Sequence, residues 1–375
     1  MRRPTGLILT ARYGSGHLQV ANTLAHKFIQ KGVDVIVSDL FGESYPAISN
    51  ITQSLLIKTF SYGPTFYKLF YYGTDKLNNK GLSQFSRYLG RKRLLELIAE
   101  HHPSFVISTF PLHSAPFVIK KSERFIPTYT VITDYCLHPY WINPLIDHYF
   151  VASEAVNTSL IKQNIPRNKI TVSGIPTREE FELPIDKRTV YQTYQLSPFK
   201  RLITILAGAD GVLKNVKQLC QFLLSNPDYQ IFIICGNNDN LYEKLRPLTV
   251  QFPRTFRLMG YVDKIHEIFA VSDCLITKPG GVTLSEALAL QVPLILHQPV
   301  PGQERENARY FEQKGAALVS NSALTTFEHV QLLTQNKDLA RKLRKELKLI
   351  YTQHSSTIIT DHVIKKLNQS AFNIR

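Results

Sequence analysis

Short apolar segments alternate with longer segments of helical periodicity along almost the whole chain. This alternation favours parallel sheets whose strands are joined by helical crossovers, so we predict an α/β protein with doubly wound sheets. The predicted strands of the first half are Gly6–Thr10, Val33–Ser38, Ser104–Thr109, Thr128–Thr133, Tyr149–Ala152 and Ile170–Ser173, with helices such as Leu18–Gln30 and Glu154–Gln163 between them. Those of the second half are Leu202–Leu206, Gln230–Cys235, Arg257–Leu258, Cys274–Thr277 and Pro293–His297.

A polar, proline-containing stretch from Gly174 to Phe199 interrupts this alternation. We interpret it as a linker between two Rossmann-like domains, residues 1–180 and 199–375, each long enough to bury its own core. The C-terminus from Thr325 onward is predicted to be helical and is rich in lysine and arginine. Two such domains are expected to face each other across a cleft and to bind ligands at the carboxyl ends of their strands.

The formal net charge of +15 indicates an anionic partner, such as nucleic acid, acidic lipid or a phosphorylated small molecule. The four cysteines form no C-x-x-C pair and lie mostly in apolar runs, which is typical of reduced core residues in a cytosolic protein. We find no signal peptide and no run of about 18 apolar residues. The sequence therefore predicts a soluble or peripheral protein.

Two polar clusters follow consecutive predicted strands in the second half. Adjacent glycines before a helix expose backbone N–H groups and the positive end of the helix dipole, which suits a phosphate. Carboxylate and amide side chains suit sugar hydroxyls, so one ligand can span both clusters. Two structural alternatives stay open, because Thr283-x-x-Glu286 is also a capping box and a glycine pair can be only a turn. The first cluster is Lys278-Pro279-Gly280-Gly281, which precedes the predicted helix Thr283–Leu290 and its Glu286. The second cluster is Pro301-Gly302-Gln303-Glu304 with Asn307.

In the first half, His17 follows Gly14-Ser15-Gly16 at a predicted helix N-terminus. The helix dipole there favours a neutral imidazole, so we predict that His17 is a general base that activates a hydroxyl nucleophile. Capping of the helix is the structural alternative. The G-x-G is weak evidence for a dinucleotide site, because Gln19 stands where a third glycine is needed.

A second candidate cluster, Thr133 to Trp141, contains Asp134, His138, Tyr140 and the only tryptophan. Asp134 is predicted to orient a catalytic histidine or to bind a sugar hydroxyl, and the two aromatic residues to face an acceptor. A structural role for this segment is an equally open alternative.

Metal and nucleotide-triphosphate chemistry find little support in the sequence. The histidines have no ligand spacing on a helix, and H-E-x-x-H, D-x-D and the P-loop pattern are absent. We therefore expect no metal and no cofactor. A diphosphate leaving group would be stabilised by backbone amides, helix N-termini and side chains such as Arg178.

Between Leu55 and Leu95, basic residues are interspersed with aromatic ones, and acidic residues are nearly absent. This composition is typical of an interfacial membrane surface, which the neighbouring aliphatic residues favour. Stacking on single-stranded nucleic acid and an amphipathic helix pair with a solvated basic face are the alternatives. The segment includes the aromatic residues Phe66 and Tyr67 and the basic residues Arg91, Lys92 and Arg93.

In this order and over nearly the whole chain, the motifs resemble the GT-B glycosyltransferases of one family. It contains plant monogalactosyldiacylglycerol synthases and the peptidoglycan precursor N-acetylglucosaminyltransferase, and the resemblance is fairly specific for its diacylglycerol branch. The motifs are Gly14-Ser15-Gly16-His17, Thr133-Asp134-Tyr135 with His138 and Trp141, Gly174-Ile175-Pro176, Ala207-Gly208-Ala209-x-Gly211-Val212, Gly260-Tyr261, Lys278-Pro279-Gly280-Gly281 and Pro301-Gly302-Gln303-Glu304 with Asn307.

The resemblance implies a first domain that binds acceptor lipid at the membrane and a second that binds a UDP-sugar. The activity it implies is inverting transfer of glucose from UDP-glucose to the hydroxyl of 1,2-diacylglycerol, and it leaves open whether a second sugar follows. The implied roles are His17 as base, the backbone at Tyr261 and Val262 for uracil, Glu286 for ribose, Gly208, Gly280 and Gly281 for the diphosphate, and Gln303 with Glu304 for the hexose. Asp210 departs from the expected pattern, since a carboxylate beside a diphosphate would repel it.

The expected partners are UDP-glucose, diacylglycerol and an anionic membrane surface on the cytoplasmic face of the cell membrane, without nucleic acid. UDP-galactose is not excluded as donor, since both epimers present similar hydroxyls. Three rival functions remain: transfer to another lipid acceptor such as a lipid diphosphate, a non-catalytic UDP-glucose sensor, and a distant NAD-dependent enzyme.

Overall fold

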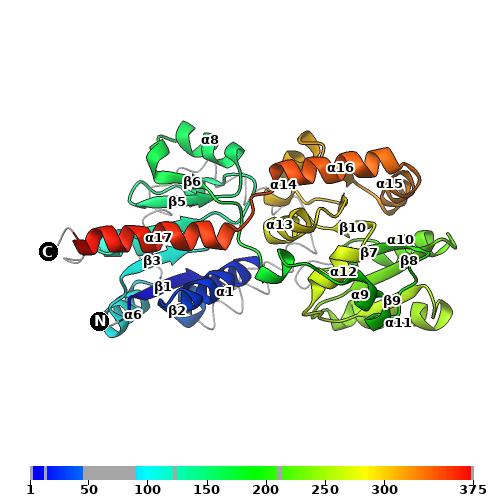
Figure 1. Ribbon diagram of the computed structural model, residues 1–375, viewed down its shortest axis with the longest axis horizontal. Helices are drawn as coiled ribbons and strands as arrows, with labels where there is room; N and C mark the ends of the chain where they lie inside the picture. The colour runs from blue at the N-terminus through cyan, green and yellow to red at the C-terminus, as the bar shows by residue number, and fades with distance from the viewer. Residues whose placement is uncertain (1–2, 12–14, 45–89, 121–124, 209–212, 373–375) are drawn as a thin grey trace. The chain divides into compact units, whose positions relative to one another are not determined.

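The computed structural model describes residues 3–11, 15–44, 90–120, 125–208 and 213–372. These residues form two compact units, one comprising the described part of 3–178 together with 352–372, and the other residues 179–351. Each unit contains one six-stranded parallel sheet with helical crossovers (Figure 1). The predicted doubly wound α/β fold is confirmed in both.

The sheet of the first unit has the order β2-β1-β3-β4-β5-β6. The chain changes direction across the sheet between β1 and β3, the place where open α/β sheets bind their ligands. The strands are β1 (Thr5–Thr10), β2 (Asp34–Asp39), β3 (Phe105–Ser108), β4 (Thr128–Val131), β5 (His148–Val151) and β6 (Ile170–Val172). The helices are α1 (Ser15–Gln30), α2 (Leu40–Ser44), α6 (Arg91–His101), α7 (Ser114–Lys120), α8 (Glu154–Lys162), α17 (Ser355–Phe372) and the 3₁₀ turns η1 (Pro139–Trp141) and η2 (Arg167–Lys169).

The sheet of the second unit has the order β12-β11-β10-β7-β8-β9, with the change of direction between β7 and β10. The strands are β7 (Arg201–Leu206), β8 (Tyr229–Ile234), β9 (Phe256–Met259), β10 (Cys274–Thr277), β11 (Leu294–His297) and β12 (Ala317–Ser320). The helices are η3 (Glu179–Phe181), α9 (Lys187–Thr193), α10 (Val216–Leu224), α11 (Asp239–Gln251), α12 (Ile265–Val271), α13 (Gly281–Leu290), α14 (Gln303–Gln313), α15 (Ala323–Gln335) and α16 (Lys337–Ile350).

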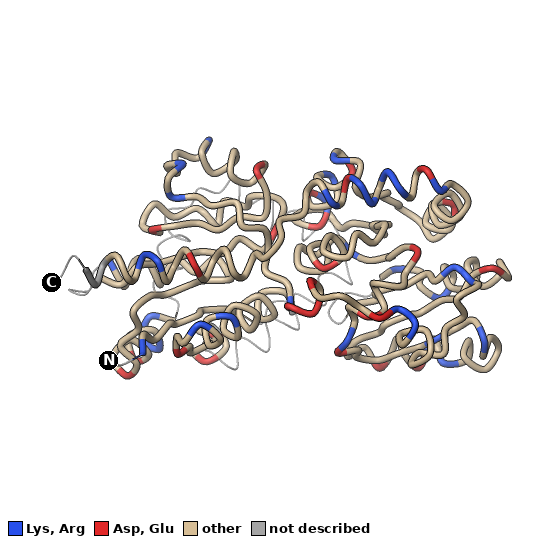
Figure 2. The backbone as a smooth tube through the Cα atoms, viewed as in Figure 1, with Lys and Arg blue, Asp and Glu red and all other residues tan. Residues whose placement is uncertain are grey.

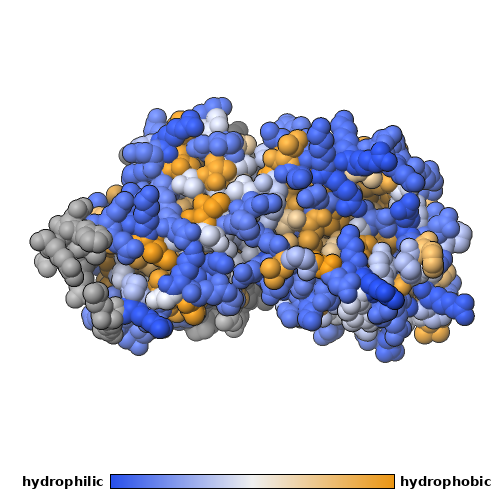
Figure 3. Space-filling view, in the orientation of Figure 1, coloured by the Kyte–Doolittle hydropathy of each residue, from blue (hydrophilic) through white to orange (hydrophobic). Residues whose placement is uncertain are grey.

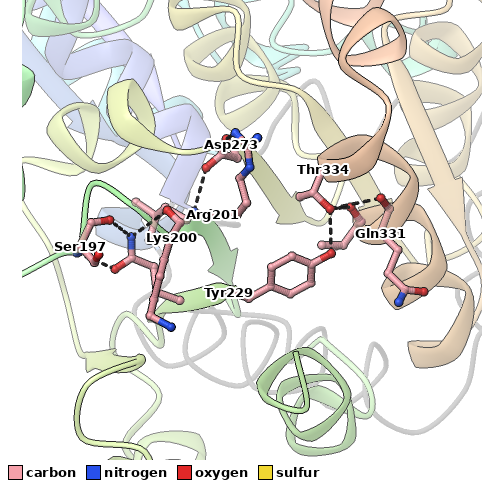
Figure 4. A network of polar contacts seen from close by, with 10 residues as sticks. Ser197, Lys200, Arg201, Tyr229, Asp273, Gln331 and Thr334 are labelled. Carbon is pink, nitrogen blue, oxygen red and sulfur yellow. Dashed lines mark hydrogen bonds and ion pairs between the residues drawn. The ribbon is translucent and has the colours of Figure 1, made fainter. Parts of the chain in front are cut away.

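Burial on both faces explains why the strands are continuous apolar runs. All residues of β8 and β10 are buried, as are those of β3 and β4. Polar side chains tie the amino ends of the central strands together in the second unit (Figure 4). Asp273 accepts hydrogen bonds from Arg201 Nη1 at 3.0 Å and from the Leu202 N–H at 2.8 Å. This end of the sheet is therefore closed by structural contacts, which leaves the carboxyl end for ligands.

The structure confirms every predicted strand and adds two features that the sequence analysis missed. β12 is a sixth strand, whose short apolar run of Ala, Leu and Val was not recognised as a strand. The predicted linker is partly folded, since it contains η3 and α9 and buries Phe181, Val190 and Leu196. Val190 packs into a core cluster with Leu202 and Phe232, so α9 belongs to the second unit.

The last helix, α17, belongs to the first unit, whereas the sequence-based boundary assigned residues 199–375 to the second domain. α17 packs beside α1, with an ion pair between Lys31 and Asp361, and the His362 ring lies against Tyr129. Gly174 permits this return of the chain. It has φ +74°, and a Cβ there would lie 2.6 Å from Ser355 Oγ. No helix in the described part of the chain is long and apolar enough to cross a membrane.

Candidate active site

The candidate base, His17, lies in the first turn of α1, directly after β1. Its Nδ1 is 2.8 Å from the carbonyl oxygen of Thr109, which follows the adjacent strand β3. A carbonyl can only accept, so Nδ1 carries the hydrogen and Nε2 of the neutral ring carries the lone pair. The structure thereby identifies Nε2 as the atom that can take a proton.

The surroundings of His17 keep its ring neutral. The half-buried imidazole has Phe110 edge-on at 5.1 Å and Trp141 at 6.3 Å between ring centroids. Burial lowers the pKa of His17 from its ordinary value, while the charge of Asp134 and the hydrogen bond to Thr109 partly oppose that effect. The pKa was predicted to be lowered by the helix dipole, whereas burial is the main cause in the structure.

Of the other candidates of the first unit, Asp134 and Trp141 lie near this histidine, and His138 contacts Tyr140. Asp134 follows β4, is 4% exposed and acts on His17 through its charge. His138 Nδ1 accepts from the Tyr140 N–H at 3.2 Å, and its ring stacks on that of Tyr140, so it caps η1. Trp141 is 4% exposed and packs in a core cluster with Ile132 and Tyr149. The structure thus gives His138 and Trp141 structural contacts, and their acceptor role stays a prediction.

In the second unit, the predicted donor-binding residues follow three neighbouring strands, β7, β10 and β11. Gly208 comes after β7, Gly280 is the N-cap of α13 after β10, and Gln303 begins α14 after β11. The carboxyl ends of parallel strands meet at one edge of the sheet, so two helix N-termini and a glycine turn are brought together there. The capping-box alternative is wrong, because Gly280 and not Thr283 is the N-cap.

Two contacts connect the loops that follow β10 and β11. Lys278 Nζ lies 3.7 Å from Glu304 Oε1, and Glu304 Oε2 accepts from the Val300 N–H at 3.1 Å. Asn307, which is fully buried, donates from Nδ2 to the Pro279 carbonyl at 3.0 Å. These contacts hold the two polar clusters together as one rim. Lys278 was not among the predicted site residues, although its position before the glycine pair was the signal that could have identified it.

The remaining donor candidates differ in burial and in the unit to which they belong. Glu286 on α13 is buried at 5% exposure, and Thr283 is half-buried. Tyr261, 71% exposed, follows the edge strand β9, and Val262 packs partly into a core cluster. Arg178 is half-buried and ends the first unit. Asp210, Phe66 and Tyr67 lie outside the described residues, as does most of the Leu55–Leu95 segment.

Of the three basic residues at the start of α6, Arg91 and Lys92 are exposed. Arg93 is engaged with acidic side chains, since its Nε lies 2.8 Å from Glu43 Oε2 and its Nη1 3.6 Å from Glu96 Oε2. Those ion pairs raise the pKa of Arg93. The contact of these three basic residues with an anionic partner stays a prediction. Within the described ranges, no group of three His, Cys, Asp or Glu side chains is placed to hold a metal ion.

Solved structures share the architecture at low sequence identity. MnaA of S. aureus, in the MnaA-UDP co-structure, aligns with a TM-score of 0.66, 12% identity and 97% coverage of each chain. MurG of Acinetobacter baumannii aligns with a TM-score of 0.62, 12% identity, and 97% and 100% coverage of this chain and of MurG. These similarities show the fold, which is the expected GT-B fold.

Several proteins are similar to this chain at much higher sequence identity than these solved structures. Residues 17–177 match the monogalactosyldiacylglycerol (MGDG) synthase family, and residues 202–357 match the glycosyltransferase family 28 C-terminal domain. A processive diacylglycerol beta-glucosyltransferase of Bacillus cytotoxicus is 44% identical over 98% of this chain and 95% of its own length. A protein of the same name from Bacillus licheniformis is 44% identical over 96% of this chain and 94% of its own. The chain therefore belongs to the family of processive diacylglycerol beta-glucosyltransferases.

Proposed function

We propose that this chain transfers glucose from UDP-glucose to the free hydroxyl of 1,2-diacylglycerol, with inversion at the anomeric carbon. The observation that carries the proposal is the 44% identity, over nearly the full length of both chains, to proteins named for this activity. The site geometry agrees with it, because one unit holds a neutral histidine base and the other holds two helix N-termini at one sheet edge. Since the relatives are named processive, the proposal includes a second transfer onto the first glucose.

In the proposed reaction, the acceptor hydroxyl gives its proton to Nε2 of His17 and its oxygen attacks the anomeric carbon. The bond between that carbon and the β-phosphate oxygen breaks, and the electron pair leaves with UDP. Backbone N–H groups at the start of α13 would stabilise the departing diphosphate. Glu286 would hold the ribose, and Gln303 and Glu304 the hexose. The reaction as proposed requires no metal ion.

The direct test is a donor screen with purified protein. Radiolabelled UDP-glucose or UDP-galactose is incubated with 1,2-diacylglycerol vesicles, with and without EDTA, and the lipid products are separated. We expect mono- and then diglucosyldiacylglycerol over many turnovers, unchanged by the chelator. Preference for UDP-galactose would overturn the donor assignment, and label transfer only to a lipid diphosphate would overturn the acceptor. UDP-glucose binding without turnover would indicate the sensor function.

We also propose that the protein works at the cytoplasmic face of the cell membrane, attracted to anionic lipid. The net charge of +15 and the exposed residues Arg91, Lys92 and Leu95 on α6 support this placement. A second basic surface lies on α16, where lysine and arginine recur along the helix and its exposed side is hydrophilic (Figures 2 and 3). It consists of Lys337, Arg341, Lys345 and Lys348, all exposed.

Reversing Arg91 and Lys92 together to glutamate is expected to weaken binding to phosphatidylglycerol-containing vesicles by about 10²-fold at low salt. Each basic residue near an anionic surface contributes about 1 kcal/mol, and reversal replaces attraction with repulsion. Vesicle sedimentation at increasing salt measures the effect, which should fade as the Debye length falls below about 10 Å. Arg93 is kept, because its ion pairs with Glu43 and Glu96 are structural.

The matched control is the double reversal of Lys187 and Arg188, an exposed basic pair that also begins a helix, α9, in the second unit. It changes the net charge equally and should bind vesicles more tightly than the α6 variant. Equal binding by the α6 variant and the wild type would show that this surface is not the membrane contact. The basic surface of α16 would then be the one to reverse.

A further inference from the structure

Thr133 carries a buried hydroxyl that is directed at the candidate base. The residue follows β4 and is 4% exposed, and its Oγ1 lies 3.0 Å from Nδ1 of His17. The carbonyl of Thr109 lies 2.8 Å from the same nitrogen. Nδ1 is thus contacted by two oxygens that come from the ends of the neighbouring strands β3 and β4.

The two oxygens differ in what they can do. The Thr109 carbonyl can only accept, and it therefore requires a hydrogen on Nδ1. With that hydrogen in place, the Thr133 hydroxyl can act only as a second acceptor toward Nδ1. The carbonyl therefore disfavours the tautomer with its hydrogen on Nε2, and the hydroxyl, which can donate or accept, takes the acceptor role beside it. Both contacts strengthen once the ring is cationic, since hydrogen bonds from charged donors are the stronger ones.

We propose that Thr133 is a positioning residue for His17. The Thr109 carbonyl selects the Nδ1–H tautomer, and the Thr133 hydroxyl accepts from the same Nδ1–H, holds the ring in place and stabilises the imidazolium that forms when Nε2 takes a proton. Asp134, the next residue, is the charged group of the described residues that acts on the ring. Its carboxylate favours the cationic ring through its charge, whereas the Thr133 hydroxyl orients the ring through a direct contact. The expected effect of Thr133 on turnover rests on the proposed glucosyl transfer. Its expected effect on the imidazole ring of His17 does not depend on that reaction.

The test replaces Thr133 with valine, which keeps the shape and removes the acceptor. We expect kcat to fall about 10–100-fold, the effect of losing a hydrogen bond to a group that becomes charged, with KM for UDP-glucose unchanged. The acid limb of the kcat–pH profile should move to lower pH, because the cation loses an acceptor and the pKa of His17 falls. Thr133→Ser should restore both kcat and the limb. If the valine variant does not fold, Thr133→Ala takes its place.

Thr10→Val is the matched control. Thr10 ends β1, is fully buried, and its Oγ1 has no hydrogen-bond partner among the residues that the structure describes. Removal of this hydroxyl should leave kcat and its pH profile as in the wild type. An equal loss in the Thr10 and Thr133 variants would overturn the proposal, because the effect would then come from any lost hydroxyl in this part of the core.

Nitrogen NMR of ¹⁵N-histidine-labelled protein tests the ring without any turnover. The His17 signals are assigned by their absence from the His17→Ala spectrum. We expect the Nδ1–H tautomer in both the wild type and Thr133→Val, because the Thr109 carbonyl remains, and a lower pKa in the variant. An unchanged pKa in Thr133→Val would overturn the inference. The expected change in a protein that shows no glucosyl transfer would instead support the inference and overturn the proposed function.

Discussion

His17→Ala is expected to lower glucosyl turnover by about 10²–10⁴-fold, the range typical of removing a general base. The affinity for UDP should change little, because the predicted donor residues other than Arg178 belong to the other compact unit. Turnover is measured with radiolabelled UDP-glucose and diacylglycerol, and UDP affinity by calorimetry. His26→Ala is the matched control, since His26 is exposed on the same helix. Near-normal turnover in His17→Ala would contradict the assignment and make Asp134 the next candidate base.

The same histidine sets the expected pH dependence. Burial lowers the pKa of His17, so the ring stays neutral at pH values below the ordinary value of 6.5. Because only the neutral ring can accept a proton, turnover should be retained as pH falls through 6.5 and be lost below the lowered pKa. A kcat–pH profile in the wild type tests this. An acid limb at or above pH 6.5 would contradict it.

Gly280→Val is expected to raise KM for UDP-glucose by about 10²-fold while the protein stays folded. Gly280 has φ −75° and ψ 133°, which any residue adopts, and a Cβ there would meet no heavy atom of the described residues within 4 Å. The fold therefore does not require glycine at this N-cap. Binding of a diphosphate at the helix N-terminus does require glycine at this position, because a valine side chain would block the approach of the phosphates to the backbone N–H groups. Each charge-assisted hydrogen bond that is lost costs about 1.5–3 kcal/mol of binding free energy.

At Gly302, the N-cap of α14, the backbone itself requires glycine, in contrast to Gly280. Its φ of 103° and ψ of −143° lie in a region that is nearly restricted to glycine, so Gly302→Ala should cost about 1–3 kcal/mol of stability. Thermal unfolding of both variants separates the two roles. Gly280→Val should melt close to the wild type, because a poorer N-cap costs about 1 kcal/mol, and Gly302→Ala should melt clearly lower. A wild-type KM in Gly280→Val would show that the diphosphate is not bound there.

Most of the architecture could be predicted because its signals are local. Strands such as β8 and β10 are buried on both faces and therefore appear as apolar runs, and glycines mark the turns that follow them. β12 escaped prediction, although Ala317–Val319 is an apolar run like those of the equally short strands β10 and β11. The segment around α9 looked like a linker because its buried residues, Val190 among them, are spaced among charges.

Local patterns in the sequence predict the two doubly wound sheets and the residue types at the ends of their strands, including His17, Gly280 and Glu304. Tertiary contacts alone establish that Nε2 of His17 is the basic atom, that Thr133 contacts the ring, and that α17 returns to the first unit. Strand and turn propensities act over a few residues. The contacts from Thr109 and Thr133 to His17 join residues 92 and 116 positions apart, and they exist only because β1, β3 and β4 are neighbours in the sheet.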